Sequence, residues 1–187
     1  MRCSGKALIS VFFLLISCAV TGAEGKKNTL VVFYSRDGHT KAVARQLAAR
    51  FNADIEELVD KKKRTGPVGF SAAGKDAITG NTTEIEPLKH DPADYSLILI
   101  GTPGWYGNVT PAVRTFVLRY DLSKKQIGLF GTVHLTGVEN ALKQLAGLIS
   151  TQEAEQIPTL SLRHRDLKED ILKEKIEDFY QKVIKDL

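Results

Sequence analysis

A loop between an apolar run and a helix-forming segment carries the clearest chemistry of this chain. Residues 29–34 are apolar or β-branched and lead directly into Ser35-Arg36-Asp37-Gly38-His39-Thr40. Backbone N–H groups at a helix start have no intrahelical partner, and the helix dipole is positive there, so such a loop stabilises an anion. The Ser35 and Thr40 hydroxyls can donate to phosphate oxygens, and Gly38 lets the backbone approach closely. The sequence therefore predicts a phosphate-binding loop at residues 35–40.

The spacing of this loop differs from two common nucleotide-binding patterns. It lacks the lysine that follows the last glycine of a Walker loop, and it lacks the three glycines of the dinucleotide fingerprint. A nucleoside triphosphatase and a nicotinamide-binding Rossmann domain are therefore disfavoured. A plain strand-to-helix turn, capped by Ser35 and Asp37, is the alternative interpretation.

A second loop contains the only tryptophan of the chain. Trp105 stands beside Tyr106 in the segment Thr102-Pro103-Gly104-Trp105-Tyr106-Gly107-Asn108. The two rings can stack on a flat heteroaromatic ligand, and the glycines permit the turns that bring backbone groups to its polar edge. An aromatic pair alone is more often a partly buried loop anchor. Combined with the first loop, it predicts a phosphorylated heteroaromatic ligand.

Hydrophobic patterning places both loops in an α/β fold. Strands are expected at 29–34, 54–59, 95–101, 126–130 and 158–162, with helices at 41–51, from 111 to about 120, at 138–149 and at the end of the chain. We expect Asp166 and Glu169 to form a capping box for that last helix. Segment 60–93 has room for at most a short helix, within 70–78. The alternation predicts a doubly wound parallel sheet in a three-layer α/β/α domain. Its ligand site should lie at the carboxyl ends of the strands, where loops 35–40, 102–109 and 131–137 meet.

These motifs resemble short-chain bacterial and archaeal flavodoxins. The resemblance rests on residues 34–40, on residues 94–103 with the aromatic loop after them, and on 113–116, and it extends over 29–187. It implies a five-stranded sheet in the order 2-1-3-4-5 and non-covalently bound FMN. Loop 35–40 would hold the phosphate, Trp105 or Tyr106 would stack on the isoalloxazine ring, and residues 132–136 would cover its other side. The cofactor-binding residues expected are Ser35, Arg36, Asp37, Gly38, His39, Thr40, Thr102, Pro103, Gly104, Trp105, Tyr106, Gly107, Asn108, Thr132 and His134.

Three features depart from the flavodoxin pattern, and the third is the export signal at the start of the chain. Asp37 stands where many members have a hydroxyl residue, and a carboxylate beside a phosphate is repulsive unless it turns outward or binds neighbouring N–H groups. Flavodoxins that shuttle electrons are usually strongly acidic, whereas this chain has a formal net charge of +4. We therefore expect its redox partner to differ from the usual basic-patch reductase.

The first residues are typical of an export signal. Arg2 and Lys6 flank the start of an apolar run at 7–16, which is shorter than the roughly 20 residues of a membrane span. We expect a signal at 1–23, a linker at 24–28 and one domain at 29–187. Leu15-Ile16-Ser17-Cys18 resembles a lipobox, which would make Cys18 the site of lipid attachment. Cleavage after Ala23 would instead discard Cys18. The chain should thus reside in the cell envelope, membrane-anchored, or be periplasmic or extracellular.

Composition narrows the function further. Both cysteines, Cys3 and Cys18, lie in the signal, and none of the four histidines has metal-ligand spacing, so no metal site is expected. Basic residues are not interleaved with aromatic ones, which disfavours nucleic-acid binding. We predict an FMN-binding electron-transfer protein that acts with a redox protein or a quinone. The alternatives are an FMN-dependent NAD(P)H:quinone reductase and a non-redox binding module on the same fold.

Overall fold

The computed structural model describes residues 27–64, 66–149 and 154–185, and within them five parallel strands form one sheet. The strands follow the order β2-β1-β3-β4-β5, which confirms the predicted topology. Their bounds are β1 Thr29–Phe33, β2 Asp54–Glu57, β3 Leu97–Pro103, β4 Gln126–Val133 and β5 Thr159–Arg163. The predicted export signal, including Cys18, lies outside the described residues. No helix in the described part of the chain has both the length and the apolarity of a membrane span.

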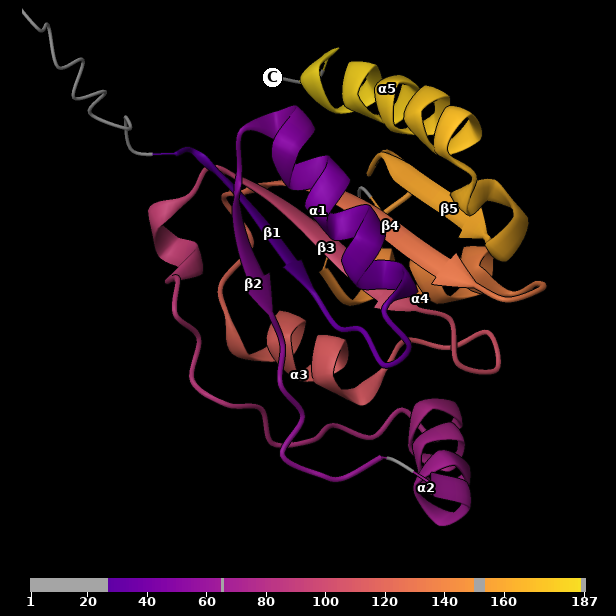
Figure 1. Cartoon of the computed structure of the whole chain (residues 1–187). Helices are drawn as coiled ribbons and strands as arrows, with labels where there is room; N and C mark the ends of the chain where they lie inside the picture. Colours follow the sequence, from indigo (N-terminus) through magenta and orange to yellow (C-terminus); the bar gives the residue numbers. More distant parts are fainter. Residues whose placement is uncertain (1–26, 65, 150–153, 186–187) are drawn as a thin grey trace, which may run out of the picture.

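Helices cover both faces of the sheet (Figure 1). Helices α1 His39–Phe51 and α5 Glu169–Lys185 pack on one face, whereas α3 Pro111–Arg119 and α4 Val138–Ile149 pack on the other. Residues of β1 alternate between the two cores, because successive side chains of a strand point to opposite faces. Leu30 and Val32 join α3 and α4, and Val31 and Phe33 join α1 and α5. All five residues of β1 are buried, which explains their continuous apolar run.

Strands β3 and β4 extend further toward the site than the sequence indicated. β3 pairs with β4 as far as Pro103 with Thr132, and β4 pairs with β5 up to Val133 with Arg163. Residues 102–103 and 131–133, expected in loops, are therefore strand residues. The loops after β3 and β4 therefore begin two and three residues later than expected, and Thr102 belongs to β3.

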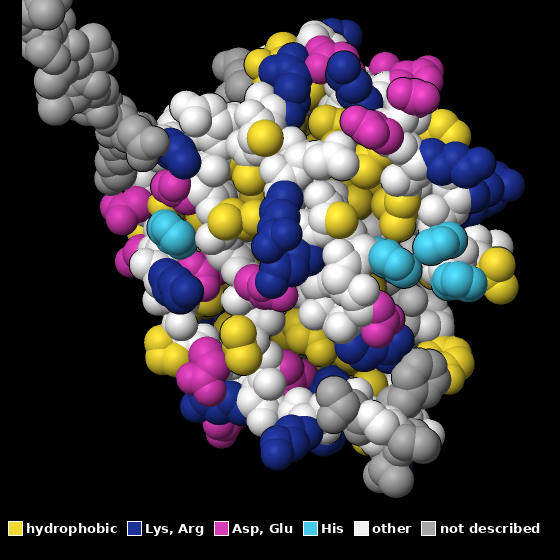
Figure 2. Space-filling model, viewed as in Figure 1, with side chains coloured by type: hydrophobic (Ala, Val, Ile, Leu, Met, Phe, Trp, Pro, Cys, Tyr) yellow, Lys and Arg dark blue, Asp and Glu magenta, His cyan; other side chains and the backbone are white. Residues whose placement is uncertain are grey.

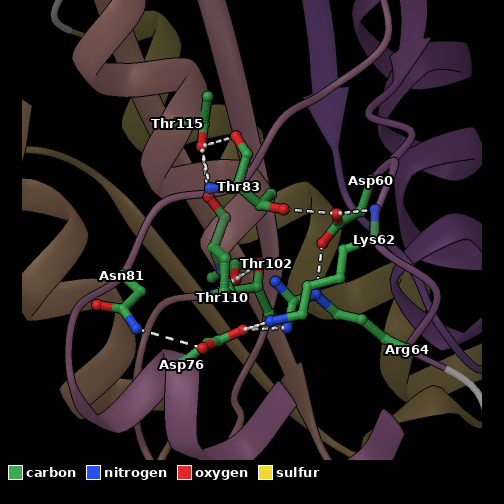
Figure 3. Close-up of polar contacts among 10 residues, drawn as sticks. Asp60, Lys62, Arg64, Asp76, Asn81, Thr83, Thr102, Thr110 and Thr115 are labelled. Carbon is green, nitrogen blue, oxygen red and sulfur yellow. Dashed lines mark hydrogen bonds and ion pairs between the residues drawn. The ribbon is translucent and has the colours of Figure 1, made fainter. Parts of the chain in front are cut away.

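Helix α2 Gly66–Ile78 corrects the expectation of at most a short helix within 70–78. Its glycines lower helix propensity, but Ala73 and Ala77 are buried in the core on the α3 side. An ion network also holds it (Figure 3). Arg64, almost fully buried, binds Asp60 and, at 2.7 Å, Asp76 of α2. Tertiary contacts thus override the local sequence preference, and α2 lies beyond the end of β2 (Figure 1).

Two short 3₁₀ helices complete the described fold, η1 Pro92–Asp94 and η2 His164–Leu167. The capping box expected from Asp166 and Glu169 is wrong. Asp166 belongs to η2, where its carboxylate accepts a hydrogen bond of 2.8 Å from the Arg163 backbone N–H, and α5 begins at Glu169. The acidic residue therefore closes the η2 turn after β5 instead of capping the long helix.

Candidate functional site

Two adjoining cavities lie where the loops after β1, β3 and β4 meet. The smaller has a volume of about 80 Å³ and the larger of about 510 Å³. Both are lined by Arg36, Gly104, Trp105 and Val133, so they form one continuous site. The smaller cavity is further lined by Asp37, His39, Thr40, Pro103 and Thr132. The larger is completed by Gly74, Tyr106, His134, Leu135 and Thr136.

Ser35 organises the start of α1 at the smaller cavity. Its Oγ accepts hydrogen bonds from the backbone N–H groups of Gly38, at 3.1 Å, and Lys41, at 3.3 Å. The first intrahelical bond is donated by Ala42 to the Gly38 carbonyl, so the N–H groups of His39 and Thr40 precede the helical ladder. Gly38 has a φ of 85°, a conformation that glycine adopts readily. Two helix-start donors are thus taken by Ser35, and two remain for a ligand.

Thr40 and Thr132 form a hydroxyl pair in the wall of the smaller cavity. Their oxygens are 2.8 Å apart, and both residues are buried. One hydroxyl donates to the other, which leaves one hydroxyl hydrogen available for a further acceptor. The pair joins the loop after β1 to the end of β4, residues 92 positions apart in sequence. It provides a donor at the place where the sequence predicts a phosphate.

Arg36 neutralises the carboxylate that departs from the flavodoxin pattern. Its Nε and Nη2 lie 3.1 and 2.9 Å from the two carboxylate oxygens of Asp37. This hydrogen bonding with Arg36 lowers the pKa of Asp37, and it raises the pKa of Arg36. The Asp37 side chain is 61% exposed, so the carboxylate turns toward solvent. The repulsion expected between Asp37 and a phosphate is therefore reduced by both orientation and pairing.

Trp105 is fixed between two other side chains. It is 7% exposed, and its ring meets Tyr34 edge-on at a centroid distance of 5.6 Å. The Arg36 guanidinium lies 5.2 Å from the centroid of the Trp105 ring, within cation–π range. Burial raises the pKa of Tyr34, and the nearby Asp60 adds to this effect. Because Tyr34 and Arg36 both contact its ring, Trp105 is held in place as a wall shared by the two cavities.

Tyr106 occupies the tip of a tight turn. Trp105 and Asn108 exchange backbone hydrogen bonds of 3.1 and 3.0 Å, and Tyr106 and Gly107 between them have φ of 51° and 74°. Positive φ at both central residues is what a type I′ turn requires. The Tyr106 side chain is largely exposed and lies against Gly74 of α2. The turn thus separates the two predicted rings, one buried and one at the rim of the larger cavity.

Five of the predicted residues line neither cavity: Ser35 and Gly38 in the loop before α1, and Thr102, Gly107 and Asn108 in β3 and the loop after it. The Thr102 hydroxyl is fully buried and 3.2 Å from that of Thr110 (Figure 3). Gln144 donates to the Asn108 side-chain oxygen at 2.8 Å, and Asn140 donates to the Gly107 carbonyl at 2.7 Å. These contacts attach the aromatic loop to α4. Thr102, Gly107 and Asn108 therefore hold β3 and the aromatic loop in place, and they do not line a cavity.

The structure also gathers three histidines that are far apart in sequence. The His164 ring lies 5.0 Å from that of His39 and 5.2 Å from that of His134, measured between centroids. Figure 2 shows histidine side chains grouped on this face of the surface. Within the described residues, no set of three His, Cys, Asp or Glu side chains has an arrangement that could hold a metal ion. The three histidines therefore form a side-chain cluster at the edge of the site.

Comparison with known proteins agrees with this geometry. A family model described as flavodoxin matches residues 28–179. The chain belongs to the flavodoxin family. A flavoprotein from Lactobacillus acidophilus NCFM, solved in complex with FMN, is 22% identical, with a TM-score of 0.60 over 79% of this chain and 99% of that one. Oxidised flavodoxin 2 from Bacillus cereus is 14% identical, with a TM-score of 0.52 over 86% of this chain and 99% of that one. At these identities, the two structures establish a shared fold.

Two residues at this flavodoxin site are not predicted from the sequence. Gly74 comes from α2, which the composition of 60–93 concealed, and His164 follows β5, whose loop was not assigned to the site. The signal that could have found His164 is topological, because β5 neighbours β4 and ends at the same edge of the sheet. No local pattern marks Gly74.

Proposed function

We propose that this chain binds FMN non-covalently and acts as an electron-transfer protein. The observation that carries the proposal is the pair of adjoining cavities, one small and lined by hydroxyl and helix-start donors, the other larger and walled by Trp105 and Tyr106. FMN has the same two parts, a phosphate and a flat apolar ring. The FMN complex of the Lactobacillus acidophilus flavoprotein, which shares this fold, supports the assignment.

The smaller cavity supplies donors suited to the phosphate. We infer that the N–H groups of His39 and Thr40 and the free hydroxyl hydrogen of the Thr40–Thr132 pair would bind its oxygens. Ser35 holds the loop in shape and retains its own hydroxyl hydrogen as a donor. Arg36 adds positive charge, which its pairing with Asp37 offsets. The charges of Arg36 and Asp37 therefore cancel in loop 35–40, and the start of α1 supplies the remaining positive potential.

The larger cavity suits a planar ring. Trp105, Tyr106, Val133 and Leu135 would enclose the ring and exclude water, and Gly104 allows the backbone to pass close to it. When bound, FMN supplies the one- or two-electron chemistry, whereas the protein orients it and sets its electrostatic surroundings. The proposal requires no side chain to act as a nucleophile or general base.

One observation favours a second candidate, an FMN-dependent NAD(P)H:quinone reductase. Tyr106 and Leu135 are 66% and 72% exposed at the rim of the larger cavity, and they present an apolar approach that a quinone could use. Steady NAD(P)H oxidation by the FMN-loaded protein with a quinone acceptor would favour this activity. Its absence, together with electron exchange with a redox protein, would favour the carrier.

The proposed cellular setting is the envelope, with the chain exported and lipid-anchored through Cys18. The support is the basic–apolar–small pattern of the first residues and the lipobox-like tetrad before Cys18. In the source organism, Cys18→Ser should abolish incorporation of labelled palmitate, and Cys3→Ser should not. Unchanged labelling in Cys18→Ser would refute the anchor.

Titration of the purified chain with FMN tests the proposed function. Binding beside Trp105 should quench flavin fluorescence, because an electron-rich indole in contact with the excited flavin donates an electron to it, and Trp105→Ala should weaken binding by about tenfold or more. Leu118→Ala, which removes an exposed side chain of α3, is the control. A folded chain that leaves FMN fluorescence unchanged would favour a non-redox binding module.

A further inference from the structure

The three clustered histidines come from three loops that meet at the site. His39 opens α1 and lines the smaller cavity, His134 follows β4 and lines the larger one, and His164 opens η2 after β5 and contacts both rings. All three residues are exposed. His164 lines neither cavity, yet it joins the two histidines that do. The cluster therefore spans the boundary between the small polar cavity and the large apolar one.

Charged groups of both signs surround the cluster. Asp37 is close enough for its pKa to be lowered by His39, after the larger effect of its hydrogen bonds with Arg36. Arg163 next to His164 lies 3.8 Å from Glu139 of α4, and the Asp166 carboxylate accepts from the Arg163 N–H. Asp37, Glu139 and Asp166 therefore already have partners. Further charged residues on the same loops and helices are Arg165, Lys168, Glu169 and Asp170.

We propose that His39, in the wall of the smaller cavity, and the neighbouring His164 and His134 form a proton-linked subsite for a phosphomonoester dianion bound in that cavity. Imidazole is the side chain whose charge ordinarily changes between pH 5 and 8. His164 neighbours both His39 and His134. Because like charges repel, the rings do not all carry charge together, but a proton on the cluster is favoured by an adjacent dianion. Binding of the dianion and uptake of a proton then reinforce each other, as linkage requires.

The inference rests on the proposed function, because the dianion it names is the phosphate of FMN. It goes beyond phosphate binding by helix-start donors, since those donors do not titrate in this range. The linkage makes retention of the ligand depend on the pH outside the cytoplasm, where the chain is proposed to reside. A free phosphate would meet the same chemistry, so the experiment separates the two sources.

The test compares FMN with riboflavin, which lacks the phosphate, on the chain purified from its host. The FMN-to-riboflavin affinity ratio should rise about fivefold between about pH 8 and about pH 6.5, which is the size expected for one partly screened charge near the dianion. Calorimetry in buffers of different ionisation enthalpy should show uptake of about half a proton per FMN near neutral pH, and none for riboflavin.

His164→Asn is the decisive variant, because it removes the central ring without changing either cavity lining. It should retain FMN binding at about pH 8, reduce the rise of the affinity ratio to less than about twofold, and abolish most of the proton uptake. The control is His90→Asn, since His90 pairs with Glu56 away from this cluster. His90→Asn should retain the full pH dependence.

The outcomes separate this inference from the proposed function. If FMN binds but His164→Asn retains or increases the pH dependence, the inference is overturned and the proposed function stands. If FMN does not bind, the proposed function fails, and the subsite is then tested with inorganic phosphate alone. Phosphate that shifts the imidazole NMR titrations of the wild type, and not those of His164→Asn, would support the subsite for a free anion. Unshifted titrations would overturn it.

Discussion

The Tyr106 ring lies against Gly74 so closely that a Cβ on Gly74 would come within 2.5 Å of Tyr106 Cε2. Gly74 belongs to α2, whereas Tyr106 belongs to the turn after β3. The absence of a side chain at Gly74 therefore sets where the exposed aromatic ring rests at the rim of the larger cavity. Helix α2 is a wall of the candidate site.

Gly74→Ala should move the Tyr106 ring and weaken ring binding. We expect the affinities for FMN and riboflavin to fall equally, by about three- to tenfold, because the change affects the ring cavity and not the phosphate loop. Fluorescence titration measures both affinities. Gly147→Ala is the matched control, since a Cβ there meets no atom within 4 Å. Equal affinities in Gly74→Ala and the wild type would show that Tyr106 does not contact the ligand.

Asp37→Asn should strengthen phosphate binding. The substitution removes a negative charge beside the smaller cavity and ends the ion pair that offsets the charge of Arg36. FMN affinity should rise by about three- to tenfold at low ionic strength, less at high salt, and riboflavin affinity should stay constant. Asp178→Asn on α5 makes the same change in net charge far from the site. Weaker FMN binding in Asp37→Asn would mean that the Arg36–Asp37 pair is needed to shape the loop.

Thr132→Val should impair the smaller cavity specifically. The variant keeps the side-chain shape but leaves the buried Thr40 hydroxyl without its partner, at a cost of about 1 kcal/mol in the free energy of unfolding. FMN affinity should fall about five- to tenfold, with riboflavin affinity unchanged. Thr132→Ser, which retains the hydroxyl, should behave like the wild type. Loss of riboflavin binding would show instead that the valine distorts the whole site.

Asp76→Asn should remove part of the acid sensitivity of the fold. Hydrogen bonds from Lys62 and then Arg64 lower the pKa of Asp76 in the folded chain. Since the folded pKa lies below the unfolded value of about 3.9, this carboxylate stabilises the fold above that pH and loses its contribution as pH falls further. Urea unfolding at about pH 7 and at about pH 3 measures the difference. The wild type should lose more stability than Asp76→Asn, and equal losses would contradict the network's role.

The parts of the fold that follow local patterns could be predicted from the sequence. Buried parallel strands are continuous apolar runs, so β1 and β3 stand out, and their order follows from the resemblance to flavodoxins. The loop at 35–40 and the aromatic loop could also be placed, because strands in a parallel sheet end at one edge. These two features sufficed to indicate a phosphorylated heteroaromatic ligand.

The remaining parts depend on contacts between distant segments. Helix α2 contains Gly69 and Gly74, and it is held by the buried ion pairs of Arg64, which no local pattern reveals. Thr102 was expected at the ring, but β3 continues past it and turns its hydroxyl to Thr110. The histidine cluster joins three loops and becomes visible only when the sheet is assembled.

The absorption spectrum of the chain purified from its own host shows whether it carries FMN. Bound FMN should give flavin bands in the visible range, which bleach on reduction with dithionite and return in air, with FMN released on denaturation in about a one-to-one ratio to protein. A folded, colourless chain that neither carries a flavin nor gains these bands when FMN is added would contradict FMN binding.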